Sequence, residues 1–146
     1  HRVDRRQRQM CIRDRIGAAL PGMLERGHGH VVLTGALTGF RGLPGSIGHG
    51  ASKAAVMHLA ESLRHDLRDT GVEVQLVNPG AIRTRLRERG DGDTSFVMEP
   101  ARAAREMFEH MSSDRFKINF PYGASLPLRA AQFLPDWAYF RLFARK

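Results

Sequence analysis

Two predicted strands on either side of one long amphipathic segment constrain the fold of this chain most strongly. Residues 31–34 are typical of a strand buried on both faces, and residues 72–77 are typical of the next strand. Between them, residues 49–69 carry apolar side chains at three- and four-residue steps, which predicts a helix with one apolar face. A strand, a helix and a second strand in this order favour a parallel sheet with a right-handed crossover.

The same alternation of helix and strand extends along the rest of the chain. Residues 16–25 and 99–111 have helical spacing, and residues 116–120 alternate in polarity as a strand does. The segment 126–146 is aromatic and basic, and we expect its two prolines, of which Pro127 is the first, to break it. The pattern therefore predicts an α/β fold of about three strands with flanking helices.

The N-terminal segment needs a separate interpretation, because residues 5–15 are similar to a common transposase-based sequencing adapter translated in one frame. We therefore expect residues 1–15 to be a non-native or disordered leader, with the fold beginning at Ile16. A basic arm that binds nucleic acid or membrane is the alternative. The leader holds six arginines against two aspartates, which is half of the net charge of +8. The remainder is only mildly basic, so we expect no nucleic-acid partner.

Several other classes of protein are excluded by composition. The only cysteine, Cys11, lies in the leader, so there is no disulfide framework and no cysteine metal site. The histidines lack metal-ligand spacing, which predicts no metal. No apolar run reaches the roughly 18–20 residues of a membrane span, and no charged-then-apolar leader resembles a signal peptide. We expect a cytoplasmic protein.

Two strings of residues carry the functional signal. The first is Gly42-Leu-Pro-Gly-Ser-Ile-Gly-His49-Gly-Ala-Ser-Lys53, at the start of the central predicted helix. The second is Asn78-Pro-Gly-Ala-Ile-Arg-Thr84, directly after the second predicted strand. Together with the apolar helix stripe between them, these strings resemble the catalytic half of the short-chain dehydrogenase/reductase family.

This resemblance covers residues 16–133 and implies the last three strands of a seven-stranded, doubly wound, Rossmann-like sheet. Residues 16–146 are accordingly expected to be the C-terminal portion of a single domain. The implied cofactor is NAD or NADP, and the sequence does not distinguish the two. The chain holds no Gly-x-Gly-x-x-Gly fingerprint, so we expect it to lack the pyrophosphate site.

The family's chemistry requires three groups that this chain keeps only in part. A Tyr donates the proton, and its phenol has a free pKa of about 10. A Lys four residues later lowers that pKa and holds the nicotinamide ribose, and a Ser polarises the substrate oxygen. By position, Lys53 matches the Lys, but His49 stands at the Tyr position and Ala36 at the Ser position. We therefore predict a degenerate active site that is inactive in the chain as given.

The resemblance also implies a cofactor-binding loop after the second predicted strand. Pro79, Gly80, Ile82 and Thr84 match the residues that contact the nicotinamide end, Thr84 through its hydroxyl and Ile82 through its backbone. The structural alternatives are an ordinary turn at Pro79 and Gly80, an exposed helix lysine at Lys53, and a solvent-facing histidine at the helix start. Three nearby hydroxyls, those of Thr34, Thr38 and Ser46, are the candidates to replace the absent Ser.

Two functional classes follow from these residues. The first is an oxidoreductase that transfers hydride between a nicotinamide and a small-molecule alcohol or carbonyl. The second is a non-catalytic relative that acts in association or ligand binding. The resemblance implies a homo-oligomer formed through helices at 16–26 and 49–69. Contact of 126–146 with a membrane surface is a third hypothesis, and we favour instead a pair of helices that covers the sheet or the pocket.

Overall fold

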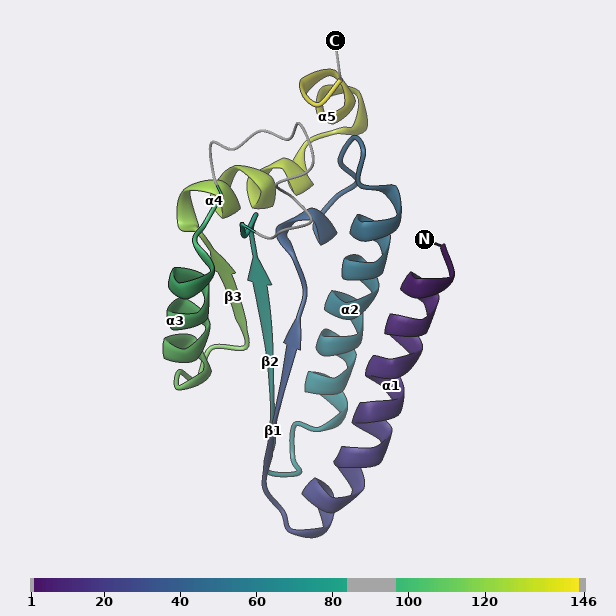
Figure 1. The fold of residues 1–146 in the computed structure, drawn as a ribbon, viewed down its shortest axis with the longest axis vertical. Coiled ribbons are helices and arrows are strands. Elements are labelled where there is room, and N and C mark those ends of the chain that lie inside the picture. The colour runs from purple at the N-terminus through teal and green to yellow at the C-terminus, as the bar shows by residue number, and fades with distance from the viewer. Residues whose placement is uncertain (1, 84–96, 145–146) are drawn as a thin grey trace.

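The computed structural model of this chain describes residues 2–83 and 97–144, and its centre is a three-stranded parallel sheet (Figure 1). The strands are β1 (Gly29–Thr34), β2 (Val72–Pro79) and β3 (Lys117–Phe120), in the spatial order β1-β2-β3. Leu33 pairs with Leu76 and Val77 pairs with Ile118, so all three strands run in one direction. The predicted α/β fold with a parallel sheet is confirmed.

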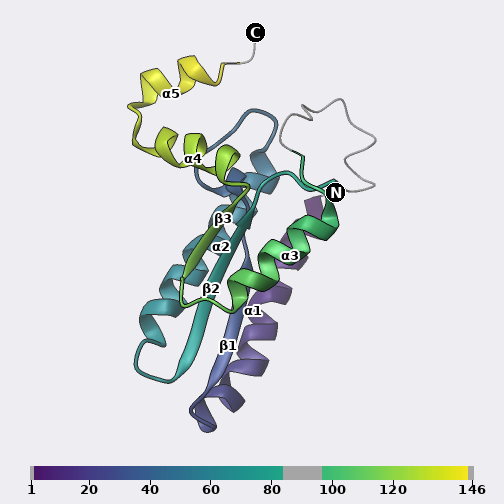
Figure 2. The same cartoon turned by 90° about the vertical axis from the view of Figure 1, so that its left-hand side faces the viewer.

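Helices cover both faces of the sheet, as Figures 1 and 2 show. On one face lie α1 (Arg2–Glu25) and α2 (Ile47–Asp66), and on the other lies α3 (Pro100–Met111). Beyond the carboxyl ends of the strands lie the remaining elements: η1 (Leu37–Gly39), α4 (Tyr122–Ala130), η2 (Ala131–Phe133) and α5 (Asp136–Leu142). The chain therefore places its C-terminal helices over the sheet edge at which parallel sheets bind ligands.

The core is built on the two faces of β2. Leu76 packs with Leu33 of β1 and with Val56 and Ala60 of α2. On the opposite face, Val77 packs with a second buried cluster from β3, α3 and the segment before it, namely Met98, Ala103, Ile118 and Phe120. β2 is therefore buried on both faces.

The expectation of two-sided burial is wrong for β1. Leu33 is buried, but Val31 and Val32 are only half-buried. The reason is position: β1 lies at the edge of the described sheet, and α3 packs against β2, with Val32 of β1 only at the margin of that cluster. An aliphatic run indicates a strand here but does not indicate how many neighbours cover it.

The first helix begins at Arg2, well before the predicted start at Ile16. Residues 2–16 contain neither glycine nor proline and are rich in arginine and glutamine, so no helix-breaking residue interrupts the segment. Ile12 and Ile16 lie one turn apart and both contact the core cluster of α2 and β2. The non-native origin of residues 1–15 concerns their source and stays a prediction.

The predicted break at Pro127 is wrong, because α4 continues through it. Proline lacks an N–H, so the carbonyl of Gly123 loses only one helical hydrogen bond there. The later proline, Pro135, does separate two elements, since it is the N-cap of α5. The C-terminal segment therefore forms the helix pair over the sheet that the sequence favours. Its contact with a membrane surface stays a prediction.

No helix within the described residues combines the length and the apolar character that crossing a membrane requires.

Candidate active site

The candidate site lies where β1 and β2 end side by side. Gly35 donates its backbone N–H to the carbonyl of Val77 at 2.9 Å, and Gly80 donates to the carbonyl of Phe120 at 2.7 Å. These two bonds extend the sheet pattern one residue past each strand. The loops after β1 and β2 therefore start from fixed positions at the carboxyl edge of the sheet.

Asn78 is the buried polar centre of this edge, and the sequence analysis gave it no role. Its side chain is fully buried, and its Nδ2 donates to Asn119 Oδ1 at 2.9 Å. A Cβ on Gly35 would lie 2.1 Å from Asn78 Oδ1, so this amide requires glycine at the end of β1. An asparagine directly after the aliphatic pair Leu76 and Val77 is the signal that could have identified it.

A cavity of about 730 Å³ opens at this edge, between the loops after β1 and β2, the start of α2, and α4. It brings together Ala36, His49, Pro79 and Gly80, four of the predicted site residues. The described lining residues are Ala36, Leu37, Thr38, Leu43, Gly45, Ser46, His49, Pro79, Gly80, Ala81, Gly123, Ala124, Pro127, Leu128 and Phe143. Predicted residues from separate loops therefore share one cavity.

The other predicted residues lie beside the cavity or outside the described chain. Lys53 is on the next turn of α2 after His49, and its Nζ donates to the carbonyl of Thr34 at 2.8 Å. Its ammonium therefore lies at the carboxyl end of β1. Ile82 is half-buried and forms a parallel bridge with Met98. Thr84 lies outside the described residues.

Few polar side chains face the cavity. His49 lies exposed in the first turn of α2, and Ser46 is the N-cap of that helix but makes no side-chain cap hydrogen bond. Ala36 presents only its backbone and a methyl group. Of the hydroxyls proposed to replace the missing Ser, those of Thr38 and Ser46 belong to lining residues, whereas Thr34 is not in the lining.

The hydroxyl of Thr38 differs from that of Ser46. Thr38 Oγ1 is itself buried and has no hydrogen-bond partner among the described residues. Ser46 is half-buried and stands within one helical turn of His49. Ser46 and His49 are therefore the polar side chains best placed to meet a ligand in a cavity whose other walls are largely aliphatic and aromatic.

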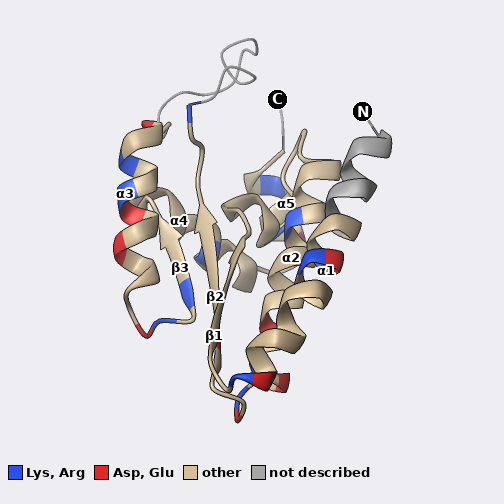
Figure 3. Ribbon diagram, turned by 60° about the horizontal axis from the view of Figure 1, so that its bottom comes forward, with Lys and Arg blue, Asp and Glu red and all other residues tan. Residues whose placement is uncertain are grey.

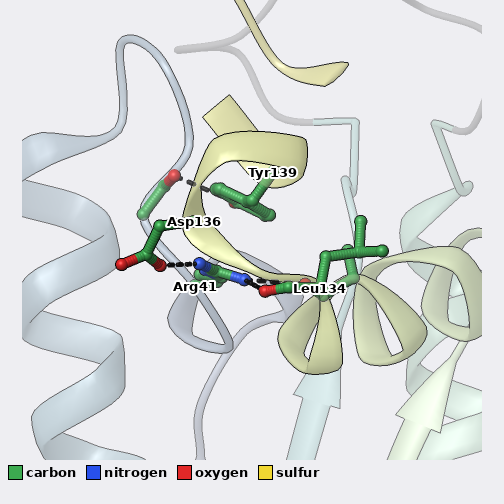
Figure 4. Close-up of polar contacts among 6 residues, drawn as sticks. Arg41, Leu134, Asp136 and Tyr139 are labelled. Atoms are coloured by element: carbon green, nitrogen blue, oxygen red, sulfur yellow. Dashed lines mark hydrogen bonds and ion pairs between the residues drawn. The ribbon is translucent and has the colours of Figure 1, made fainter. Parts of the chain in front are cut away.

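The C-terminal wall of the cavity is held in place by Arg41 (Figure 4). Its Nη1 donates to the carbonyls of Ala131 at 3.0 Å and Leu134 at 2.7 Å, and its Nη2 pairs with the carboxylate of Asp136. The guanidinium carbon lies 3.9 Å from the centre of the Tyr139 ring. One arginine of the loop after β1 therefore fixes η2 and α5 together.

Tyr139 completes this clamp from the other side. Its hydroxyl donates to the carbonyl of Gly42 at 2.9 Å, and its side chain is almost fully buried. Burial raises the pKa of the Tyr139 phenol above its usual value, and the nearby Arg41 guanidinium partly opposes that shift. The sequence analysis missed both residues, because a single arginine in a glycine-rich loop carries no pattern that names a partner so far along the chain.

Charges of both signs occur along the described elements. Figure 3 shows acidic and basic residues mixed on α1 and α3 and at the turns that join helices to strands. Within residues 2–83 and 97–144, no three histidine, cysteine, aspartate or glutamate side chains are grouped so as to hold a metal ion.

Comparison with known proteins places these features in one family. Residues 15–93 match the short chain dehydrogenase family. The chain is 38% identical over 121 residues to an uncharacterized oxidoreductase of Myxococcus xanthus, covering 83% of this chain and 48% of that protein. It is 37% identical over 132 residues to a 1-deoxy-11-beta-hydroxypentalenate dehydrogenase of Streptomyces exfoliatus, covering 86% of this chain and 47% of that protein.

Solved structures give the same result. A short-chain dehydrogenase from Sphingobium yanoikuyae in complex with NADPH superposes with a TM-score of 0.68 at 27% identity. The match covers 91% of this chain and 52% of that one. The chain therefore spans about half the length of the relatives that it matches. Its strand order, its cavity and these similarities together establish that the chain belongs to the short-chain dehydrogenase/reductase family.

Proposed function

We propose that this chain forms the substrate-facing part of an NAD(P)-dependent oxidoreductase of alcohols and carbonyls, and that by itself it does not transfer hydride. The observation that carries the proposal is the single cavity lined by Ala36, His49, Pro79 and Gly80, with Lys53 one turn away. These positions match the family's Ser, Tyr, nicotinamide loop and Lys. The chain's own residues thus offer a place for the substrate oxygen.

The described residues fit one end of the implied cofactor. Pro79 and Gly80 line the cavity, and the Lys53 ammonium lies at the end of β1, so these residues would hold the nicotinamide and its ribose. The phosphate end has no counterpart, because the sequence contains no Gly-x-Gly-x-x-Gly. When bound, the cofactor supplies or accepts the hydride. We expect the isolated chain to give no saturable binding of NADPH or NADH by calorimetry, and a micromolar dissociation constant would contradict this.

The substituted positions determine the expected rate. A neutral imidazole at His49 can donate a hydrogen bond to a carbonyl oxygen, but it replaces the phenol that the family uses as its acid. Ala36 offers the developing oxyanion no hydroxyl. Loss of one such donor lowers turnover about 10²–10³-fold in other enzymes. We therefore expect the full-length protein that contains this chain to bind cofactor but to reduce carbonyls slowly.

The test restores both groups in that full-length protein. His49→Tyr combined with Ala36→Ser is expected to raise kcat by several orders of magnitude and to leave the Kd for the cofactor nearly unchanged. Ala124→Ser is the matched control, because it adds a hydroxyl to the α4 wall of the same cavity, where the family has no polariser. If the double variant binds cofactor without any gain in rate over the parent, the alternative function, a non-catalytic relative that acts in association or ligand binding, replaces this one.

A further inference from the structure

A second cavity lies on the other side of the loop that follows β1. Its volume is about 600 Å³, and its walls come from the loop between Thr38 and Pro44, the first turns of α2, and α5. Aromatic and aliphatic side chains dominate these walls, among them Phe40, Ile47 and Phe140. Its described lining contains none of Ala36, His49, Lys53, Pro79, Gly80 and Ile82.

The walls of this second cavity present no charge to a ligand. Arg41 is the only charged side chain among its described lining residues. The guanidinium of Arg41 is already bonded to the carbonyls of Ala131 and Leu134 and to Asp136, and its face rests on Tyr139. The Tyr139 hydroxyl is also engaged, since it donates to Gly42. A charged or strongly polar group placed here would lose its hydration without gaining a partner.

The two cavities adjoin each other. Thr38, Leu43, Ser46 and Phe143 line both of them. The first cavity has His49 and Ser46 as polar contacts. In the second, Arg41 and Tyr139 are already paired, and the hydroxyls of Thr38 and Ser46 belong to the wall that it shares with the first. The geometry is that of one elongated site with a polar end and an apolar end.

We propose that the second cavity holds the hydrocarbon tail of the substrate whose oxygen lies in the first. The substrate class is then an alcohol or ketone with an extended, uncharged hydrocarbon portion. A short polar hydroxy acid, or a substrate with an anionic group at its far end, does not fit. This inference rests on the proposed function for its claim that the substrate oxygen lies in the first cavity. The claim that the second cavity takes a hydrocarbon tail rests only on the residues that line it.

The test uses the chain itself and a series of 2-alkanones from 2-pentanone to 2-undecanone as probes, with Kd measured by calorimetry or ligand-observed NMR. Each methylene that enters an apolar site contributes about 0.8 kcal/mol, which is about a fourfold fall in Kd. The expected result is a Kd that falls in this way as the chain lengthens. A Kd that does not depend on length would overturn the proposal.

Matched variants separate the two cavities. Ala54 lines only the second cavity and Ala124 only the first. Ala54→Phe is expected to remove the gain from longer ketones and to leave the Kd of 2-pentanone unchanged, whereas Ala124→Phe should weaken the whole series. If Ala54→Phe does not keep the melting transition of the parent, Ala51→Phe, at another residue that lines only the second cavity, makes the same test. An unchanged length dependence in a folded variant would contradict the proposal.

A charged probe tests the chemistry of the far end. 9-Oxodecanoate has the methyl ketone of 2-decanone with a carboxylate at the opposite end, and we expect it to bind at least about tenfold more weakly than 2-decanone. Equal affinities would show that the tail stays in solvent. Sedimentation of the parent and Ala54→Phe tests the competing occupant: if the variant dissociates an oligomer, a second copy of the chain fills this cavity and the proposal is wrong.

The outcome is separable from that of the proposed function. Length-dependent binding, without reduction of the same ketones by the full-length His49→Tyr, Ala36→Ser variant and NADPH, would defeat the proposed oxidoreductase and leave the apolar subsite standing. Reduction of ketones with rates and KM values that do not depend on chain length would support the oxidoreductase and overturn the apolar subsite.

Discussion

At the scale of single residues, Arg41 stabilises the wall of the cavity that contains His49, although it does not line that cavity. Its stem and guanidinium are mostly covered, with 21% of the side chain exposed, and it bonds to two backbone carbonyls that precede α5. Both carbonyls lie after the last residue of α4, and that of Ala131 also accepts the backbone N–H of Leu134 at 3.3 Å. The position of Phe143, which lines both cavities, therefore depends on an arginine in the loop after β1.

Replacing Arg41 should release the C-terminal wall. Arg41→Met keeps the length of the stem but removes the charged donors, and we expect a loss of about 2–3 kcal/mol in the free energy of unfolding. Faster hydrogen exchange of the α5 amides would locate that loss. Arg102→Met is the control, because the exposed Arg102–Glu106 pair should contribute only about 0.3–0.5 kcal/mol. Unchanged exchange in α5 would show that Arg41 does not hold the wall.

Tyr139 predicts a specific dependence on pH. Burial raises the pKa of the folded-state phenol above the unfolded value of about 10, so the folded chain retains this proton at pH values where the unfolded chain loses it. The contribution of this protonated phenol to the free energy of unfolding is therefore complete below about pH 10 and declines as the pH rises through the folded-state pKa. Thermal melts between neutral and alkaline pH should show a steeper decline in Tm for the parent than for Tyr139→Phe. Tyr122→Phe, at an exposed tyrosine, should follow the parent.

At the scale of elements, the turn that joins α2 to β2 fixes how the crossover meets the sheet. Gly71 has a φ of 72°, which is a left-handed conformation that favours glycine. A Cβ at this position would lie 2.1 Å from the carbonyl oxygen of Gly27, in the turn between α1 and β1. The two connections at this end of the sheet therefore pass each other with no room for a side chain.

Substitution at this turn should cost far more than at a comparable open turn. Gly45 has almost the same φ, 73°, but a Cβ there meets nothing within 4 Å. Gly45→Ala is expected to lower the free energy of unfolding by about 1 kcal/mol, because only the left-handed backbone conformation disfavours alanine there. Gly71→Ala should lower it by about 3 kcal/mol or more, because backbone must move as well. Similar losses for both variants in urea titrations would mean that the contact with Gly27 is easily relaxed.

Elements whose stability is local were predictable from the sequence, and elements that depend on distant contacts were not. The stripe of α2 and the alternation of β3 appear within a short window, so their type was predicted correctly. The start of α1 and the continuation of α4 through Pro127 were not predicted, because helix propensity alone does not show which segments pack on a core. The clamp on α5 joins residues 93 positions apart, which no local pattern reveals.

At the scale of the whole molecule, the candidate site was predictable where it follows the strand ends. Ala36 and Gly80 lie within two residues of the ends of β1 and β2, and the carboxyl ends of parallel strands lie at one edge of the sheet. The far walls of the site come from α4 and α5, whose placement depends on tertiary packing. For this reason the sequence predicted the polar end of the site and missed the apolar cavity beside it.

The outer layer of the molecule carries the last prediction. In Figure 1, α1 lies beside α2 on the outside of the sheet. The apolar residues of α1 are only partly covered: Ile12, Ile16 and Leu20 contact the core but stay half-buried, and Leu24 is 42% exposed. An incompletely covered apolar helix face favours association with another such face. We therefore expect the chain to form a homo-oligomer through α1 and α2.

Sedimentation velocity over a range of concentrations should detect this association. Ala55 is exposed on α2 and lines a shallow pocket beside Ile12 of α1, so Ala55→Glu places a charge in the expected interface and should shift the chain to monomer. Ala104→Glu adds the same charge at an exposed position of α3, on the opposite face of the sheet, and should leave the oligomer intact. A parent that sediments as a monomer at every concentration would refute the association itself. Dissociation by Ala104→Glu, with Ala55→Glu unchanged, would instead place the interface on α3, where Phe108 is 73% exposed.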